Sequence, residues 1–578
     1  MTRFPHAATA LAASALLLAC GGGSGEDPLP QLSPAQGAAL ANCTTLTSFS
    51  FASTTITAAS VVAAGTLTNA GQPVGEHCLV TGRMNERVSA VDGQAYAIGF
   101  QMRLPRDWSG RFLYQGNGGT DGVITAADGG VSIGSGGLLR NGLQQGFAII
   151  SSDAGHTNAQ NPLFGRDPQA RLDFGYQAVG TLTPMAKALV RAAYGKGPDR
   201  SYIAGTSNGG RHAMVAAARY AAEYDGYLAN SPGFNLPKAA IANLWSAQQF
   251  DRVATTKVVN GQPDYESALP QATERRLLSN AILARCDALD GASDGLVQDT
   301  EACRTAFDLQ RDVPTCPGAR DGSCLSADQK TVLAAVFAGA RNTAGQALYS
   351  GFPFDPGIVQ TGWGDWKLRS NLRTGRDPVA TAFIFTSPPS TDLTLATDAS
   401  KTAAFALAFN VDTDAPKIFA TSGPYTESAM SFMTPPSPER LDTLRNRGAK
   451  LLVVHGTADG IFSVDDTATW YRALDANYGG AAARFARFFR VPGMGHSRGG
   501  PSTDQYDALA ALVAWVEQGQ APERIIASAR GAGNAGGVNA ELPASWSATR
   551  TRPLCPFPLV ARYKSGDVEQ AASFACEP

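Results

Sequence analysis

Ser207 lies at the centre of Gly205-Thr-Ser-Asn-Gly209, a G-x-S-x-G motif between an apolar run at 201–204 and a helical pattern over 210–224. Strand, tight turn and helix in this order form a nucleophile elbow, in which a strained serine exposes its hydroxyl at the carboxyl end of a sheet. The free N–H groups that begin the helix favour negative charge on an attacked carbonyl. The motif alone has low specificity in a glycine-rich chain. The partners of the serine therefore decide its interpretation.

A serine hydrolase needs a histidine, and the sequence has six. His496 fits this role, because it follows a strand-like segment at 485–490 and lies in a turn rich in glycine. Upstream, 451–455 has the pattern of a buried parallel strand, and the turn after it presents Asp459. Ser207, Asp459 and His496 follow the chain order of the α/β-hydrolase triad. The alternative is an ordinary Asp-Gly turn and a loop histidine.

The remaining histidines are assigned other roles. His212 lies one turn too far along the helix to face the serine, and His455 is expected to pack at the end of its strand. His6 lies in a leader segment, and His77 and His156 precede the nucleophile.

The composition predicts a large globular protein without a nucleic-acid partner. The 578 residues carry a formal net charge of −2, and 44% of them are hydrophobic. Strands and helices alternate over 36–232 and again over 437–578, which predicts an α/β-hydrolase core with a parallel sheet and helices on its faces. A strand at 96–104 alternates in polarity as an antiparallel strand does.

The alternation is lost over 233–436, between the proposed nucleophile and the proposed acid. This position predicts an inserted lid domain that covers the site and selects the substrate. A separate tandem domain is the alternative. It is less favoured, because Asp459 and His496 lie beyond the segment and must return to Ser207.

The N-terminus has the features of an export signal. Arg3 precedes an apolar stretch at 8–18 that is too short to span a membrane, and 1–20 ends in Leu-Ala-Cys20. This pattern predicts a lipoprotein signal peptide with Cys20 as the lipidated residue, followed by a flexible tether over 21–35. The alternative is an ordinary secretory signal cut nearby. We expect a periplasmic or outer-membrane-anchored monomer that contacts the membrane only through its lipid.

Eight cysteines remain after Cys20, an even number that indicates four disulfides in an exported protein. Proximity suggests pairs, although sequence alone leaves other pairings open. Zinc is not expected, because the chain has no C-x-x-C motif. The suggested pairs are Cys43–Cys78, Cys286–Cys303, Cys316–Cys324 and Cys555–Cys576.

An acidic loop lies within the inserted segment. Asp287, Asp290 and Asp294 fall within eight residues, with glycines at the turns. Carboxylate and backbone oxygens in a tight loop suit Ca²⁺, although the spacing is not that of an EF-hand. The two neighbouring cysteines favour a structural ion over a catalytic one. The alternative is a solvated acidic turn.

With these motifs in view, the chain resembles the tannase/feruloyl esterase family over nearly all of its mature length. The elbow, the acidic loop, the glycine turn before His496 and the cysteine pattern carry the resemblance, together with 167–175, 417–423 and 551–555.

The resemblance implies a role for each motif. Ser207 is the expected nucleophile, His496 its general base and Asp459 the acid that orients the base. The expected oxyanion donors are the backbone N–H groups of Gly119 and Asn208. The implied calcium ligands are Asp287, Asp290 and Asp294 with the carbonyls of Ala292 and Leu296, and the implied aromatic substrate contacts are Trp366 and Phe462.

The chain departs from the family pattern in two places. Thr206 and Ser497 stand where the family carries a disulfide between the residues that flank the serine and the histidine. The arginine that binds a terephthalate carboxylate has no counterpart in register, although Arg369, Arg373 and Arg376 are near in sequence.

We therefore expect a serine carboxylic-ester hydrolase for small aromatic acid esters of feruloyl, galloyl or mono-hydroxyethyl terephthalate type. One alternative is a hydrolase of aliphatic or hydroxyalkanoate oligomer esters. A second is a lipoprotein that binds such a ligand without turnover.

Overall fold

The computed structural model describes residues 1–2, 28–130 and 136–578. At its centre is a nine-stranded sheet with the order β15-β14-β11-β10-β8-β9-β6-β5-β2. The strands from β15 to β9 are parallel to their neighbours, and β6, β5 and β2 continue the sheet antiparallel. The bounds are β2 Thr54–Val62, β5 His77–Val88, β6 Ala95–Pro105, β8 Arg111–Gly116, β9 Ala148–Ser152, β10 Arg200–Thr206, β11 Gly226–Asn230, β14 Lys450–Gly456 and β15 Ala486–Val491.

The burial of each strand explains this division. Every residue of β11 and β14 is buried, as expected for parallel strands with both faces covered. The edge strand β2 instead mixes half-buried and exposed positions, as an antiparallel strand with a solvated face does. The antiparallel strand predicted at 96–104 is confirmed as β6. The sheet is mixed rather than wholly parallel, because β2 and β5 extend its antiparallel edge.

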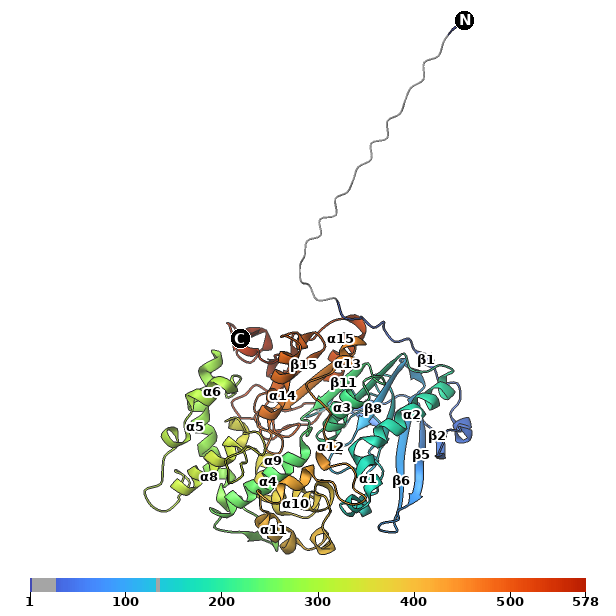
Figure 1. Cartoon of the computed structure of the whole chain (residues 1–578). Helices are drawn as coiled ribbons and strands as arrows, with labels where there is room; N and C mark the ends of the chain where they lie inside the picture. The colour runs from blue at the N-terminus through green and yellow to red at the C-terminus, as the bar shows by residue number, and fades with distance from the viewer. Residues whose placement is uncertain (3–27, 131–135) are drawn as a thin grey trace.

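Helices cover both faces of the sheet (Figure 1). Apolar residues of α2 (Ala178–Tyr194), α3 (Asn208–Arg219) and α14 (Val464–Asn477) share one buried cluster with the sheet, and α15 (Ala508–Gln518) packs into another. The helix predicted at 210–224 is shorter, because α3 ends at Arg219. Two further helices are α1 (Pro168–Leu172) and α13 (Asp442–Asn446).

Residues 233–436 contribute no strand to the nine-stranded sheet. Their longest helices pack around a separate apolar cluster that also takes in Phe164 and Phe174. In Figure 1 these green to orange helices gather on one side of the sheet. They are α4 Leu236–Asp251, α5 Arg276–Cys286, α6 Thr300–Ala306, α7 Leu309–Asp312, α8 Ala327–Ala338, α9 Thr361–Gly364, α10 Asp377–Ala380, α11 Ala399–Ala408 and α12 Ala429–Met433.

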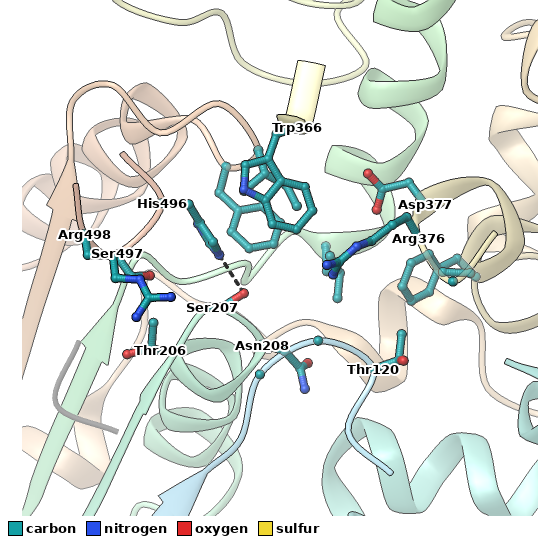
Figure 2. A pocket seen from close by; sticks show the side chains of 18 of the residues that line it. Thr120, Thr206, Ser207, Asn208, Trp366, Arg376, Asp377, His496, Ser497 and Arg498 are labelled. Atoms are coloured by element: carbon teal, nitrogen blue, oxygen red, sulfur yellow. Dashed lines mark hydrogen bonds between the residues drawn. The ribbon is translucent and has the colours of Figure 1, made fainter. Parts of the chain in front are cut away.

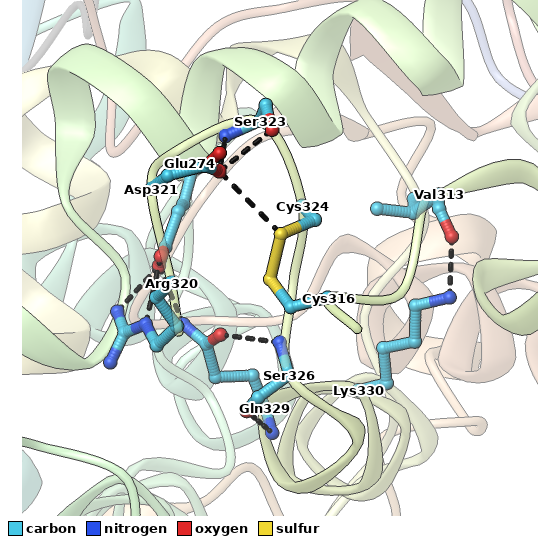
Figure 3. The surroundings of a disulfide bond; sticks show 10 residues. All are labelled: Glu274, Val313, Cys316, Arg320, Asp321, Ser323, Cys324, Ser326, Gln329 and Lys330. Atoms are coloured by element: carbon cyan, nitrogen blue, oxygen red, sulfur yellow. Dashed lines mark hydrogen bonds and ion pairs between the residues drawn. A yellow bond between two sulfur atoms is a disulfide. The ribbon is translucent and has the colours of Figure 1, made fainter. Parts of the chain in front are cut away.

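All four predicted disulfides are present: Cys43–Cys78, Cys286–Cys303, Cys316–Cys324 and Cys555–Cys576. Figure 3 shows the third of them, which closes a short loop before α8. Arg320 in this loop forms an ion pair with the buried Glu274, with 2.6 Å between the charged atoms. The disulfide and the ion pair together hold the loop against the helices of the inserted segment.

The lipoprotein prediction concerns residues that the structure does not describe. Cys20 and almost all of 1–20, as well as 21–27 of the tether, lie outside the described residues. Within the described part of the chain, no helix combines the length and the apolar character that a membrane span requires.

Candidate active site

Three glycines allow Ser207 to stand at a sharp turn between β10 and α3. A side chain on Gly205 would lie 2.3 Å from the backbone of Gly209, and one on Gly209 would lie 2.2 Å from the carbonyl oxygen of Gly116. The end of β10, the start of α3 and the end of β8 therefore touch through bare backbone. Ser207 itself has φ 64° and ψ −122°, a strained conformation of the kind that a nucleophile elbow imposes.

The structure brings the three predicted triad residues together. The Ser207 hydroxyl lies 2.8 Å from His496 Nε2, as Figure 2 shows by a dashed line. His496 Nδ1 lies 2.8 Å from Asp459 Oδ2. Asp459 Oδ1 accepts the backbone N–H groups of Ile461 and Phe462 at 2.9 and 3.0 Å. Burial raises the pKa of Asp459, but His496 and His455 outweigh burial and hold it well below its usual range.

His455 is a residue whose part in the site the sequence did not predict. It ends β14 as expected, but its Nε2 lies 3.2 Å from Asp459 Oδ2, so the carboxylate contacts two histidines. His455 Nδ1 lies 2.9 Å from the hydroxyl of Thr467 on α14. When Thr467 donates to Nδ1, the neutral imidazole carries its proton on Nε2 and donates it to Asp459. The four-residue spacing of a strand-end histidine and the turn acid is the signal that could have revealed this contact.

The predicted oxyanion donors flank the serine. Asn208 begins α3, and its backbone N–H has no acceptor in the described part of the chain, as expected at a helix start. Gly119 lies in the loop after β8, which passes below Ser207 in Figure 2, and its φ of 67° favours glycine. Both residues line the same cavity as Ser207.

The cavity over Ser207 has a volume of about 560 Å³. The two predicted aromatic contacts, Trp366 and Phe462, lie with their ring centroids 5.6 and 5.3 Å from that of His496. Phe385 and Ile461 add apolar surface. The inserted segment and the two flanking parts of the chain thus build the pocket jointly.

Of the three arginines near this site in sequence, the structure directs one to the cavity. Arg369 forms ion pairs with Asp264, Glu266 and Asp365, so its charge is compensated elsewhere. Arg373 donates to the carbonyl of Pro263.

Arg376 lines the cavity (Figure 2). Its guanidinium lies 4.7 Å from the ring centroid of Trp366 and has no hydrogen-bond acceptor among the described residues. Burial raises the pKa of the adjacent Asp377 to about 6. The pocket therefore contains an available cation beside an apolar slot.

The inserted segment also braces the loops that carry Asp459 and His496. Asp355 accepts the Thr457 hydroxyl at 2.6 Å and the Gly493 N–H at 3.3 Å. Gln360 donates to the carbonyl of Ala458 at 3.2 Å. These bonds hold the two loops from the side of the inserted segment.

Thr206 and Ser497, the positions at which the resemblance to the family implied a disulfide, both line the cavity. Their hydroxyl oxygens are buried and have no hydrogen-bond partner. Neither side chain therefore holds the His496 loop through a polar contact of its own.

The acidic loop fits a cation only in part. Asp290 Oδ2 is buried without a partner, and burial, with smaller contributions from Asp294 and Asp287, raises the pKa of Asp290 to about 7. Asp287 accepts the N–H groups of Asp294 and Gly295, and Asp294 forms an ion pair with Arg552. Within the described residues, no three His, Cys, Asp or Glu side chains are grouped as a metal site. An ion here would need the backbone carbonyls as well.

Comparisons with known proteins identify the family of the chain. The chain matches the family described as tannase and feruloyl esterase over residues 78–577. A mono(2-hydroxyethyl) terephthalate hydrolase from Piscinibacter sakaiensis is 40% identical over 87% of this chain and 85% of its own. A probable feruloyl esterase B from Emericella nidulans is 28% identical over 85% of both chains.

Solved structures show the same fold. An esterase from Aspergillus oryzae aligns with a TM-score of 0.69 at 22% identity, over 92% of this chain and 99% of that one. The tannin acyl hydrolase from Aspergillus niger aligns with a TM-score of 0.64 at 19% identity, over 91% and 92%. The family match and the 40% identical relative go further than fold. The chain belongs to the tannase and feruloyl esterase family and is a carboxylic ester hydrolase.

Proposed function

We propose that this protein hydrolyses esters of aromatic carboxylic acids through an acyl-enzyme on Ser207. The observation that carries the proposal is the continuous contact from Ser207 through His496 to Asp459 at the floor of an aromatic-lined cavity. In the first step, His496 Nε2 takes the hydroxyl proton while Ser207 Oγ bonds to the ester carbonyl carbon. Asp459 holds the imidazole tautomer and stabilises the imidazolium.

The tetrahedral intermediate then collapses. Its oxyanion accepts the N–H groups of Gly119 and Asn208, each worth about 3 kcal/mol in comparable sites. The alcohol leaves with the proton from His496, and a water activated by the same nitrogen attacks the acyl-enzyme. The aromatic acid is released, and Ser207 regains its proton.

The pocket favours an aromatic acyl group with a negative charge at its far end. Trp366 and Phe462 flank the site of reaction, and Arg376 presents a cation without a hydrogen-bonded partner. A relative at 40% identity is named for mono(2-hydroxyethyl) terephthalate, whose acid part carries such a carboxylate. A terephthalate monoester thus fits the pocket better than an uncharged aliphatic ester does.

The architecture that we propose is an α/β-hydrolase core with a lid. In support, the nucleophile follows β10, β8 and β9 exchange places in the sheet order, and the acid and base follow β14 and β15. Residues 36–232 and 437–578 would form the core. Residues 233–436 would form the lid, since they supply Trp366 and Arg376 to the cavity.

We also propose a structural Ca²⁺ bound by Asp287, Asp290 and Asp294 with the carbonyls of Ala292 and Leu296. The unpartnered Asp290 Oδ2 supports this site. Chelation with EDTA should then lower the melting temperature by several degrees, and added Ca²⁺ should restore it. A melting temperature that changes neither with EDTA nor with added Ca²⁺ would contradict the calcium site.

Export as a lipid-anchored monomer remains part of the proposal. The four disulfides support an oxidising compartment. A Cys20→Ala variant that still fractionates with membranes would contradict the lipid anchor.

The deciding experiment measures hydrolysis of mono(2-hydroxyethyl) terephthalate, methyl ferulate, methyl gallate and p-nitrophenyl butyrate by the protein and its Ser207→Ala variant. We expect turnover of at least one aromatic ester and its loss in the variant. Turnover of the butyrate alone would contradict the aromatic pocket. Activity that survives in Ser207→Ala would contradict the mechanism.

A further inference from the structure

A buried carboxylate lies behind the proposed oxyanion hole. Asp121 follows Gly119 by two residues, and its side chain is only 2% exposed. One oxygen, Oδ2, accepts Asn208 Nδ2 at 2.8 Å and contacts His212 Nε2 at 2.9 Å. Burial and the charge of Arg211 lower the pKa of His212. The ring is therefore neutral, and its Nε2–H group donates to the carboxylate of Asp121.

These contacts join the two segments that carry the oxyanion donors. Asp121 and Gly119 belong to the loop after β8, whereas Asn208 and His212 belong to α3. The Asn208 amide makes one more bond to this loop, a longer one of 3.4 Å to the carbonyl of Asn117. Asp121 thus supplies the two shortest side-chain contacts that tie the spacing of the two N–H groups.

The amide of Asn208 is held at its other end by Arg211. The fully buried guanidinium donates from Nε to Asn208 Oδ1 at 2.6 Å. Its remaining nitrogens donate to the carbonyls of Gly175 and Phe174 at 2.7 and 2.9 Å. The Asn208 side chain points away from Ser207 in Figure 2, so it acts by holding the start of α3 in position.

The backbone conformation of the Gly119 loop requires contacts that hold it in place. Gly119, Asp121 and Gly122 all have positive φ, at 67°, 55° and 86°. For a non-glycine residue this conformation is strained, and it persists only where surrounding contacts enforce it. Asp121 is the strained residue and also makes those contacts.

We propose that Asp121 is a positioning residue that sets the distance between the two oxyanion donors by bonding the Gly119 loop to α3. This inference rests on the proposed esterase mechanism. Because the oxyanion forms only during reaction, loss of Asp121 should weaken binding of the transition state and leave binding of the ground state intact.

Asp121→Asn is the main test. We expect kcat on the best aromatic ester of the panel to fall about 30-fold with KM within twofold, an effect smaller than loss of a whole oxyanion donor. A phenylboronic acid, which forms a tetrahedral adduct with the serine, should bind more weakly by the same factor. The product acid should bind as it does to the unmodified protein. A purely structural role would alter all three measurements together.

Two variants complete the design. Asn208→Ala keeps the backbone N–H but removes the amide that Asp121 holds, so its effect and that of Asp121→Asn should not add. Glu517→Gln is the matched control, because Glu517 is a buried carboxylate that pairs with Arg111 near the start of the central strands. It should lower stability and leave kcat unchanged.

Unchanged kcat in Asp121→Asn, or in Asn208→Ala should the first variant not fold, would overturn the inference. So would additive effects of the two substitutions. Ser207→Ala keeps the two hypotheses apart: full activity in that variant would overturn the esterase mechanism, whatever Asp121 does.

Discussion

The two walls of the cavity are built in opposite ways. On the wall formed at the carboxyl ends of the strands, Asp459 and Asn208 are buried, and each polar atom of their side chains has a defined partner. On the wall formed by the inserted segment, Arg376 is exposed, and its guanidinium has no hydrogen-bond partner among the described residues. The catalytic groups of the first wall are held by hydrogen bonds, and its loops are braced in part by the inserted segment, whereas Arg376 on the second wall can still gain a partner from a ligand.

This difference assigns separate tasks to the two walls. Catalysis needs donors and a base at fixed positions before the substrate arrives, because reorganisation during the reaction costs rate. Selection of the substrate needs groups that gain partners only on binding. Substitutions on the strand wall should therefore lower kcat, and those on the inserted wall should change KM and substrate preference.

Asp459→Asn should have the largest effect. In this variant the N–H groups of Ile461 and Phe462 hold the amide oxygen, so the NH2 group faces His496 Nδ1 and donates to it, and the imidazole loses the tautomer that leaves Nε2 free for Ser207. We expect kcat to fall about 10⁴-fold, as in the corresponding protease variant. KM should change little. A fall in kcat of less than about tenfold would contradict the claim that the strand wall carries the catalytic groups.

His455 should give the next effect on the strand wall. His455→Ala leaves Asp459 with one histidine and opens a cavity beside it, and we expect kcat to fall by one to two orders of magnitude, about 1.4 kcal/mol per order. His455→Gln can still donate to Asp459 and should recover most of this loss. Thr467→Val removes the hydroxyl that sets the His455 tautomer. Its kcat should lie between those of the His455→Ala and His455→Gln variants. Equal activity of the alanine and glutamine variants would contradict a hydrogen-bonding role.

The sequence predicted the strand wall well for a physical reason. The elbow around Ser207, the strand at 450–455 and the glycine turn before His496 are local patterns, each fixed by neighbours in the chain. His455 and Asp121 escaped prediction, because their partners come from other elements: Thr467 on α14 for one, and Asn208 on α3 for the other. The four-residue spacing of His455 and Asp459 hints at their contact, but no short-range pattern shows the partners on other elements.

The inserted wall was harder to predict. Its short helices have weak periodicity, and the direction of each arginine depends on which acid lies nearby. Arg369 and Arg376 are seven residues apart in the same segment, yet one meets three carboxylates and the other faces the cavity. Only the three-dimensional structure separates them.

Arg376→Gln tests whether the inserted wall selects the substrate. We expect KM for mono(2-hydroxyethyl) terephthalate to rise about tenfold with kcat nearly unchanged, because a charge-assisted hydrogen bond at a partly screened position is lost. Methyl ferulate, which has no second carboxylate, should be unaffected. Arg369→Gln is the matched control, since that arginine is paired away from the cavity. An equal rise in KM for both esters would contradict recognition of a carboxylate.

Asp377 makes the same recognition dependent on pH. Burial raises its pKa to about 6, so it is charged at pH 7.5 and largely neutral at pH 5. A neutral Asp377 no longer offsets the positive charge of Arg376, so Arg376 attracts a substrate carboxylate more strongly. KM for the terephthalate monoester should therefore fall as the pH is lowered from 7.5 to 5, and Asp377→Asn should remove this trend. A KM that is constant in the unmodified protein would contradict it.

The smallest effect is expected from a new disulfide between the Ser207 and His496 loops on the strand wall. The resemblance to the family implied a disulfide at Thr206 and Ser497, and their buried hydroxyls have no partners, so replacing these side chains removes no hydrogen bond. Thr206→Cys with Ser497→Cys should form a bridge that constrains the unfolded chain and raises the melting temperature by about 2–5 °C. The bridge would act in parallel with Asp355 and Gln360, which already brace these loops, so kcat should stay within about twofold of its original value. A confirmed bridge with an unchanged melting temperature would show that the hydrogen bonds from the inserted segment already constrain these loops as fully as a disulfide would.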